Sequence, residues 1–87
     1  MAKMKKYRIL LYEWDCDNGD MLWREEITIE AKSFEEAKER AWREVELLVA
    51  GAEKEGWEKV TETDHSIVLS KPEVGTHEVG FEITELR

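Results

Sequence analysis

This sequence has only one cysteine and one proline, and it has no long apolar run. A single cysteine cannot form an internal disulfide, so the fold must depend on a hydrophobic core and a reducing compartment fits best. A membrane-spanning helix needs about 18 consecutive apolar residues, and the sequence contains neither such a run nor a segment typical of a signal peptide. From these absences we expect a cytoplasmic protein.

Residues with catalytic or metal-binding chemistry are also few. Cys16, His65 and His77 are the only cysteine and histidines, and no two of them lie at the short spacing of a zinc half-site. The sequence contains no glycine-rich phosphate loop, no triad order and no paired-acid motif. We therefore predict a protein that is not an enzyme and that has no metal site and no cofactor.

The acidic stretch 15–20 comes nearest to a metal motif. Asp15, Asp17 and Asp20 are spaced roughly as in a calcium loop, but Gly19 comes one position early and a strand, not a helix, is expected to follow. An acidic hairpin turn explains these residues better, because aspartate side chains support turns. The same carboxylates should disfavour the thiolate of Cys16, which argues against a nucleophilic role.

Basic residues are scarce over most of the chain. The net charge is −8, and because Lys3, Lys5, Lys6 and Arg8 precede every acidic residue, the remainder has nine basic and 21 acidic side chains. Nucleic-acid affinity depends on contacts from Lys and Arg to phosphate, so we expect no direct nucleic-acid binding. A basic surface on another protein suits this charge better.

The sequence does contain enough apolar side chains for one small core. Its 87 residues are 41% hydrophobic and include four Trp, two Tyr and two Phe, which predicts a single domain over residues 1–87. Charged residues reach 39%, yet the apolar positions are periodic, which argues against disorder. We expect the basic residues 1–6 to be a frayed lead-in.

Residues 33–55 have the only long helical pattern. Ser33 followed by Glu36 forms a capping box that predicts the start of a helix, and Gly56 predicts its end. At about 100° per residue, one stripe roughly 80° wide is apolar and should face the core. The stripe consists of Phe34, Ala37, Ala41, Val45, Leu48 and Ala52.

Two strands, Tyr7–Asp15 and Met21–Ala31, are predicted before the helix. Asn18-Gly19 between them indicates a two-residue hairpin turn, because both residues tolerate the positive φ that a type I′ turn needs. A hairpin centred on these residues places Trp14 opposite Trp23, an aromatic pair of the kind that stabilises sheets.

This register also predicts which side chains the helix covers. The covered row is expected to contain Leu10, Tyr12, Trp14, Trp23, Ile27 and Ile29. Tyr7, Ile9 and Leu11 are then expected on the opposite face, where an exposed apolar row would form a secondary interface.

The segment after the helix predicts further strands. Residues 59–62 and 66–70 are short β-like pieces around a turn, and one bent strand or a hairpin would account for both. Residues 77–86 alternate between apolar and polar side chains, as in a half-buried strand that pairs with residues 67–69. The predicted fold class is α+β: a two-layer sandwich with one long helix on an antiparallel sheet of four or five strands, in the order ββαββ or ββαβββ.

The helix has a second pattern beside its apolar stripe. Trp42 and Val49 lie at about 100° and 80° from Ala41, next to four glutamates at roughly 120–160°. We predict a partner-binding face from six residues: Glu35, Glu39, Trp42, Glu46, Val49 and Glu53. A solvated helix face, with Trp42 against the sheet edge, is the alternative interpretation.

These features favour a small acidic protein-binding module or inhibitor that occupies a basic, nucleic-acid-binding surface of a partner protein. A phage or mobile-element inhibitor of a host nuclease or CRISPR-type complex would have this size and charge. Duplex DNA carries one charge per about 1.7 Å, whereas glutamates seven residues apart on a helix are about 10.5 Å apart. A nucleic-acid mimic would therefore need further acids to join the helix: Glu25, Glu30, Glu78 and Glu82.

A second hypothesis is a self-associating structural or accessory subunit without catalytic activity. Such a homodimer would form through Tyr7, Ile9 and Leu11, or through an open sheet edge.

Overall fold

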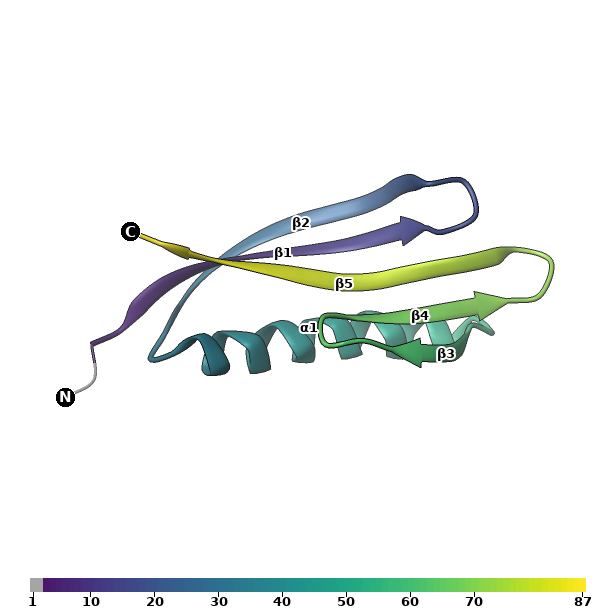
Figure 1. Cartoon of the computed structure of the whole chain (residues 1–87). Coiled ribbons are helices and arrows are strands. Elements are labelled where there is room, and N and C mark those ends of the chain that lie inside the picture. Colours follow the sequence, from purple (N-terminus) through teal and green to yellow (C-terminus); the bar gives the residue numbers. More distant parts are fainter. Residues whose placement is uncertain (1–2) are drawn as a thin grey trace.

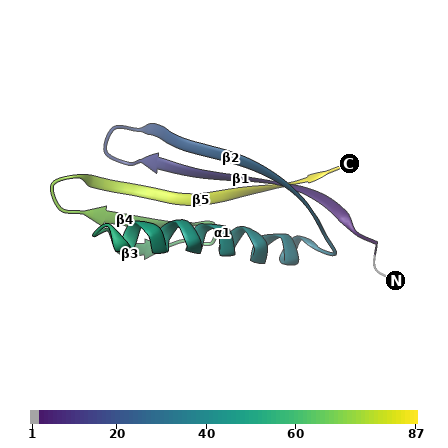
Figure 2. The same ribbon diagram turned by 180° about the vertical axis from the view of Figure 1, so that it is seen from behind.

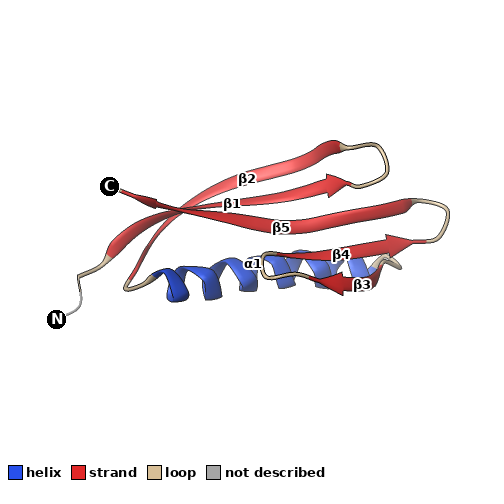
Figure 3. Cartoon of the chain, viewed as in Figure 1, coloured by secondary structure: helices blue, strands red, loops and turns tan. Residues whose placement is uncertain are grey.

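The computed structural model describes residues 3–87 as five strands and one helix, so residues 1–2 of the predicted lead-in lie outside the described residues. Lys5 and Lys6 already belong to the first strand, which makes the lead-in shorter than predicted. Figures 1 and 3 show the elements along the chain. They are β1 (Lys5–Asp15), β2 (Asp20–Ala31), α1 (Phe34–Lys54), β3 (Glu58–Glu62), β4 (Ser66–Lys71) and β5 (Gly75–Leu86).

The strands form one antiparallel sheet in the order β2-β1-β5-β4-β3, and α1 packs on one of its faces (Figures 1 and 2). This confirms the α+β prediction of one helix on an antiparallel sheet, with five strands. The two pieces after the helix form a hairpin, β3–β4, rather than one bent strand. As predicted, the last strand pairs with β4, and Ile67 lies opposite Val79.

Both ends of α1 follow from local sequence. The Ser33 hydroxyl accepts a hydrogen bond from the N–H of Glu36 (3.2 Å), which satisfies one of the free donors at the helix start. At the other end Gly56 has a φ of +99°, and the N–H of Trp57 donates to the Ala52 carbonyl (3.2 Å). This is a Schellman motif, in which glycine takes the left-handed position that other residues adopt only with strain.

The helix contacts the sheet along a row of residues four apart. Ala37, Ala41, Val45 and Val49 are the buried residues of α1. Such a row is inclined to the helix axis, so the contact line turns around the helix from one end to the other. For this reason the predicted stripe is only partly correct, since its members Phe34 and Leu48 are 48% and 38% exposed.

The turn between β1 and β2 has four residues rather than two. Asp15 pairs with Asp20, and Gly19 N–H donates to the Asp15 carbonyl (2.8 Å). Gly19 has a φ of +72°, whereas Asn18 is not left-handed, so the predicted type I′ turn at Asn18-Gly19 is wrong. The Asn-Gly signal identified the hairpin correctly but not the length of its loop.

The predicted register of this hairpin is therefore wrong by one residue. Ile9 pairs with Ile27 and Tyr7 with Ile29, and β2 contains a bulge at Leu22. A shift of one residue moves every side chain of a strand to the other face. Tyr7, Ile9 and Leu11 are consequently at most 2% exposed beneath α1, and their predicted role as an uncovered secondary interface is wrong.

On the sheet face that α1 does not cover lie the alternate side chains of β1. Leu10, Tyr12 and Trp14 lie there and are partly buried, so their predicted place beneath the helix is wrong. Trp23 pairs with Glu13 on the helix side of the sheet, but α1 leaves it 38% exposed.

Candidate functional site

The glutamates of the predicted partner-binding face all lie on the surface of α1. Glu35, Glu39, Glu46 and Glu53 are exposed. Glu39 and Glu46 lie two turns apart near the middle of the helix, while Glu35 and Glu53 lie in its first and last turns. The helix therefore presents two central carboxylates, with one further carboxylate toward each end.

A hollow of about 690 Å³ opens between α1 and β3 on this side of the molecule, and we call it the α1–β3 hollow. It is lined by Glu39, Trp42, Arg43, Glu46 and Glu62. The structure thus brings together three of the six predicted site residues and adds Glu62 from β3. The lining contains three carboxylates and one guanidinium, so the hollow is acidic.

The carboxylates that come from the helix are free to meet an external cation. Within residues 3–87, neither Glu39 nor Glu46 forms an ion pair, whereas Glu62 is held by Lys59 at 3.0 Å. The ion pair on the helix joins Arg40 to Glu44 (3.3 Å). The two central glutamates therefore keep their charge available for a partner.

Trp42 is half-buried and lines this hollow. Its ring meets the ring of Phe81 edge-on, with centroids 5.2 Å apart and an interplanar angle of 80°. The core holds one side of the indole and the hollow exposes another, which is a typical arrangement for an aromatic anchor at an interface. Val49, by contrast, is 5% exposed and belongs to the core, so its predicted place on the binding face is wrong.

The sheet acids considered for nucleic-acid mimicry do not join the helix. Glu78 and Glu82 lie on the face opposite α1, as does Glu30, which pairs with Lys6. Glu25 pairs with Leu11 and so lies on the helix side, but on β2, at the far edge of the sheet from β3. The hollow alone therefore has too few charges to imitate duplex DNA.

A second hollow, of about 260 Å³, lies on the other flank of α1. Glu13 and His77 lie in its lining within hydrogen-bonding distance, with Oε2 and Nδ1 2.9 Å apart. The Trp57 ring lies 4.4 Å from the His77 ring, centroid to centroid. The sequence did not predict this group of three residues. Glu13 lies on β1, His77 on β5 and Trp57 just after α1, and only the pairing of β1 with β5 and the path of the chain after α1 bring them together.

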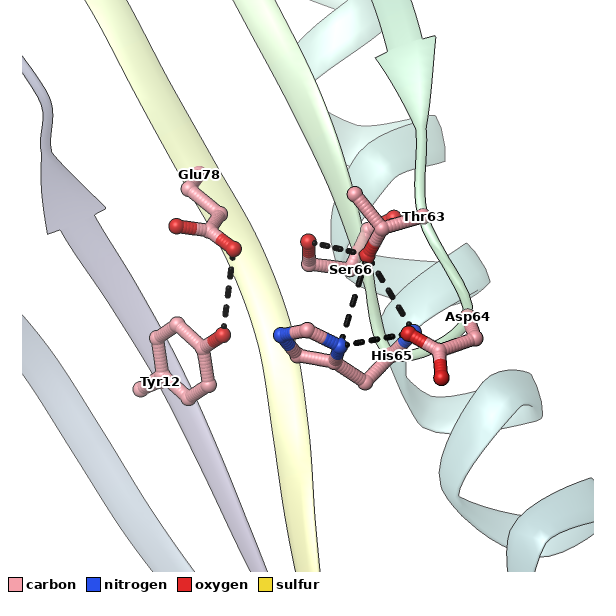
Figure 4. Close-up of polar contacts among 6 residues, drawn as sticks. All are labelled: Tyr12, Thr63, Asp64, His65, Ser66 and Glu78. Carbon is pink, nitrogen blue, oxygen red and sulfur yellow. Dashed lines mark hydrogen bonds and ion pairs between the residues drawn. The ribbon is translucent and has the colours of Figure 1, made fainter.

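On the uncovered face, Tyr12 reaches across the neighbouring strand β5 (Figure 4). Its hydroxyl donates to Glu78 Oε2 (3.2 Å) and lies over Gly80, where a side chain would collide with it. Burial raises the pKa of Tyr12 well above its usual range, and the Glu78 carboxylate adds to that shift. The phenol is therefore a structural hydrogen-bond donor, neutral at ordinary pH.

The turn before β4 holds further polar contacts, also shown in Figure 4. The hydroxyls of Thr63 and Ser66 are 2.8 Å apart, and His65 Nδ1 lies 2.9 Å from Asp64 Oδ1. Ser66 is fully buried, and no hydrogen bond joins it to His65 within residues 3–87. These contacts join side chains and main chain within the turn.

The acidic segment 15–20 uses the carboxylates of Asp15 and Asp17 as hydrogen-bond acceptors. Asp15 accepts from the N–H groups of Asp17 and Asn18, and Asp17 Oδ2 accepts from the Thr76 N–H (2.8 Å). Partial burial raises the pKa of the Cys16 thiol, and nearby carboxylates raise it further. Across residues 3–87, no three potential ligands among His, Cys, Asp and Glu are grouped to hold a metal ion.

Comparison of the chain with protein-family models, with curated proteins and with solved structures found no match. The helix of residues 34–54 has too many charged side chains for a membrane span, and residues 3–87 contain no other candidate.

Proposed function

We propose that this protein is a non-enzymatic acidic binding module that occupies a basic surface of a partner protein, as an inhibitor would. The observation that carries the proposal is the α1–β3 hollow, which Glu39, Glu46 and Glu62 line together with the half-buried Trp42. Charged rims steer a partner and set the association rate, while a desolvated aromatic residue supplies much of the affinity.

The chemistry of the hollow defines the partner's surface. Lysine or arginine side chains would meet Glu39 and Glu46, and an aliphatic or aromatic contact would cover the exposed edge of Trp42. Surfaces that bind nucleic acid are rich in such cations, so a nuclease or a CRISPR-type complex is a suitable target class. Blocking such a surface requires no catalytic group.

The alternative, a homodimer through an apolar sheet face, is not supported by the fold. Tyr7, Ile9 and Leu11 are sealed beneath α1 and offer no surface. The long outer strand β2 carries Glu25, Glu26 and Glu30, and charged side chains on an edge strand oppose pairing with a second copy.

Affinity capture at low salt from cells of the source organism, with and without phage infection, tests the proposal. When the double variant Glu39→Gln/Glu46→Gln is the bait, the amount of captured partner should fall about tenfold or more below that of the parent. The reason is that close charge pairs at interfaces contribute about 1.5 kcal/mol or more. The matched control is Glu26→Gln/Glu30→Gln, which removes the same charge from the uncovered face.

The purified partner then provides the decisive measurement. Its affinity should fall steeply between about 50 and 200 mM salt, because screening shortens the range of charge interactions. Equal losses in the two double variants would show that only total charge matters. A complex that is insensitive to salt would overturn the proposal.

A further inference from the structure

Strand β5 has a neighbouring strand on both sides over only part of its length. Its residues 75–80 pair with β4 on one side, and residues 77–80 also pair with β1 on the other. Residues 81–86 continue along β1, but no strand within residues 3–87 pairs with their other edge. Figure 1 shows β3 and β4 ending midway along β5, so that the sheet has five strands at one end and three at the other. We call the open edge of residues 81–86 the β5 notch.

The notch presents unpaired main-chain groups. The N–H of Phe81 donates to the His65 carbonyl (2.9 Å), and beyond it no main-chain hydrogen bond reaches this edge of β5 within residues 3–87. Alternate residues of an antiparallel strand direct their N–H and C=O groups to the same edge. Ile83 and Glu85 therefore direct theirs into the notch, where a further strand would find donors and acceptors in register.

A hollow of about 390 Å³ lies beside this edge. Its lining residues are Phe34, Lys38, Asp64, His65, Phe81, Glu82 and Ile83. Phe34 is 48% exposed although it is apolar, and it faces the hollow from the first turn of α1. The notch thus combines an open strand edge with an apolar floor between strand and helix.

We infer that the β5 notch binds an extended cationic peptide segment of a partner protein, which adds to the sheet antiparallel to β5. The segment would continue the line of β4, pair with Ile83 and Glu85 through its main chain, and place one apolar side chain over Phe34. Main-chain pairing supplies affinity in this mode, and the pocket for an alternate side chain supplies specificity.

Charge selects a cationic segment over a second copy of the chain. The charged lining residues of the hollow are two carboxylates, Asp64 and Glu82, and one ammonium, Lys38; His65 also lines it. The whole chain has a net charge of −8. Two copies meeting at their notches would bring like net charges together, whereas a basic peptide is attracted. This inference uses a surface separate from the α1–β3 hollow and does not rest on the proposed function.

The test is an NMR titration of the ¹⁵N-labelled protein with a seven-residue peptide that alternates lysine with valine or phenylalanine. Bound peptide should slow hydrogen exchange at the amides of Ile83 and Glu85 at least tenfold, with shift changes centred on the notch. The same peptide, N-methylated at alternate residues, keeps its charge and side chains but loses main-chain donors. It should bind at least tenfold more weakly.

Variants separate the notch from general electrostatics. Phe34→Ala should weaken peptide binding about fivefold or more, while Leu47→Ala, which removes a 70% exposed leucine elsewhere on α1, should leave it unchanged. Lys38→Glu should strengthen binding, since it removes the opposing ammonium, and it leaves the apolar floor intact. Glu39→Gln/Glu46→Gln should change peptide affinity less than twofold, so failure here is distinct from failure of the proposed function.

Equal binding of the methylated and parent peptides would overturn the inference. So would notch shifts that depend on protein concentration without peptide, because they would identify a second copy as the occupant.

Discussion

The two halves of β5 have the same alternating pattern but different surroundings. Residues 75–80 pair with β4, residues 77–80 also pair with β1, and Val79 is 4% exposed. Residues 81–86 have β1 on one side and the notch on the other, and Glu82, Thr84 and Glu85 are exposed. The alternation of apolar and polar residues therefore does not show whether both edges of a strand are paired. That depends on how far the neighbouring strand extends. Four predictions test this difference and the strand register on which it depends, from the largest expected effect to the smallest.

Hydrogen exchange should separate the two halves most strongly. The amide of Val79 points toward β4 and should exchange only through extensive opening, whereas those of Ile83 and Glu85 have no strand to bond with. Native-state exchange followed by NMR should show protection of Val79 exceeding theirs by about 1,000-fold or more. Comparable protection would mean that the notch is closed in solution.

Two neighbouring substitutions in β1 test which face the helix covers. Ile9→Ala removes a fully buried side chain and should lower the free energy of unfolding by about 2–5 kcal/mol. Leu10→Ala, on the uncovered face, should cost under half as much. Urea denaturation measures both, and a larger loss for Leu10→Ala would restore the register centred on Asn18-Gly19.

Gly80 lies where the two halves of β5 meet. A Cβ there would lie 2.6 Å from the Tyr12 hydroxyl and 2.7 Å from the His65 carbonyl oxygen. Gly80→Ala should therefore destabilise the protein by about 1–3 kcal/mol through overpacking. Gly51→Ala is the matched control, since nothing lies within 4 Å of its added Cβ, and it should stabilise the helix by about 0.5–1 kcal/mol.

The smallest effect is expected at the turn of the β1–β2 hairpin. The side-chain hydrogen bond from Asn18 holds the pKa of Asp15 below its ordinary value, so Asn18→Ala should raise that pKa. A depressed carboxyl pKa contributes stability above the unfolded value of about 3.9, and this contribution is lost as the pH falls. The stability difference between parent and variant should therefore shrink below about pH 4. A carbon-detected NMR titration from pH 2 to 6 reports the pKa, and an unchanged value would contradict the role of Asn18.

Much of the fold could be predicted because its signals are local. Ser33 and Gly56 set the ends of the helix through groups within a few residues, and the alternation of residues 77–86 is itself a strand pattern. The hairpin register could not be predicted in the same way. The register depends on a four-residue loop and on a bulge at Leu22. The sequence of this segment is compatible with either a two-residue or a four-residue loop.

The candidate site shows the same division between local and distant information. Glu39, Trp42 and Glu46 share one helix flank by spacing alone, so the sequence places them together. Glu62 joins them through the path of the β3–β4 hairpin, which no local pattern encodes. Val49 was misplaced because the inclined row of contacts carries the core toward that flank near the end of α1.

A different consequence follows from the junction of the two hairpin turns. The Cys16 N–H donates to the Thr76 carbonyl (3.0 Å), and Asp17 Oδ2 accepts from the Thr76 N–H, which ties the β1–β2 turn to the start of β5. The two hairpins are thereby coupled at their tips, so one cannot fray without loosening the other. Cys16, the single cysteine, lies at this contact between the two turns. A fluorescent label on its thiol would report whether peptide binding at the distant β5 notch changes the contact.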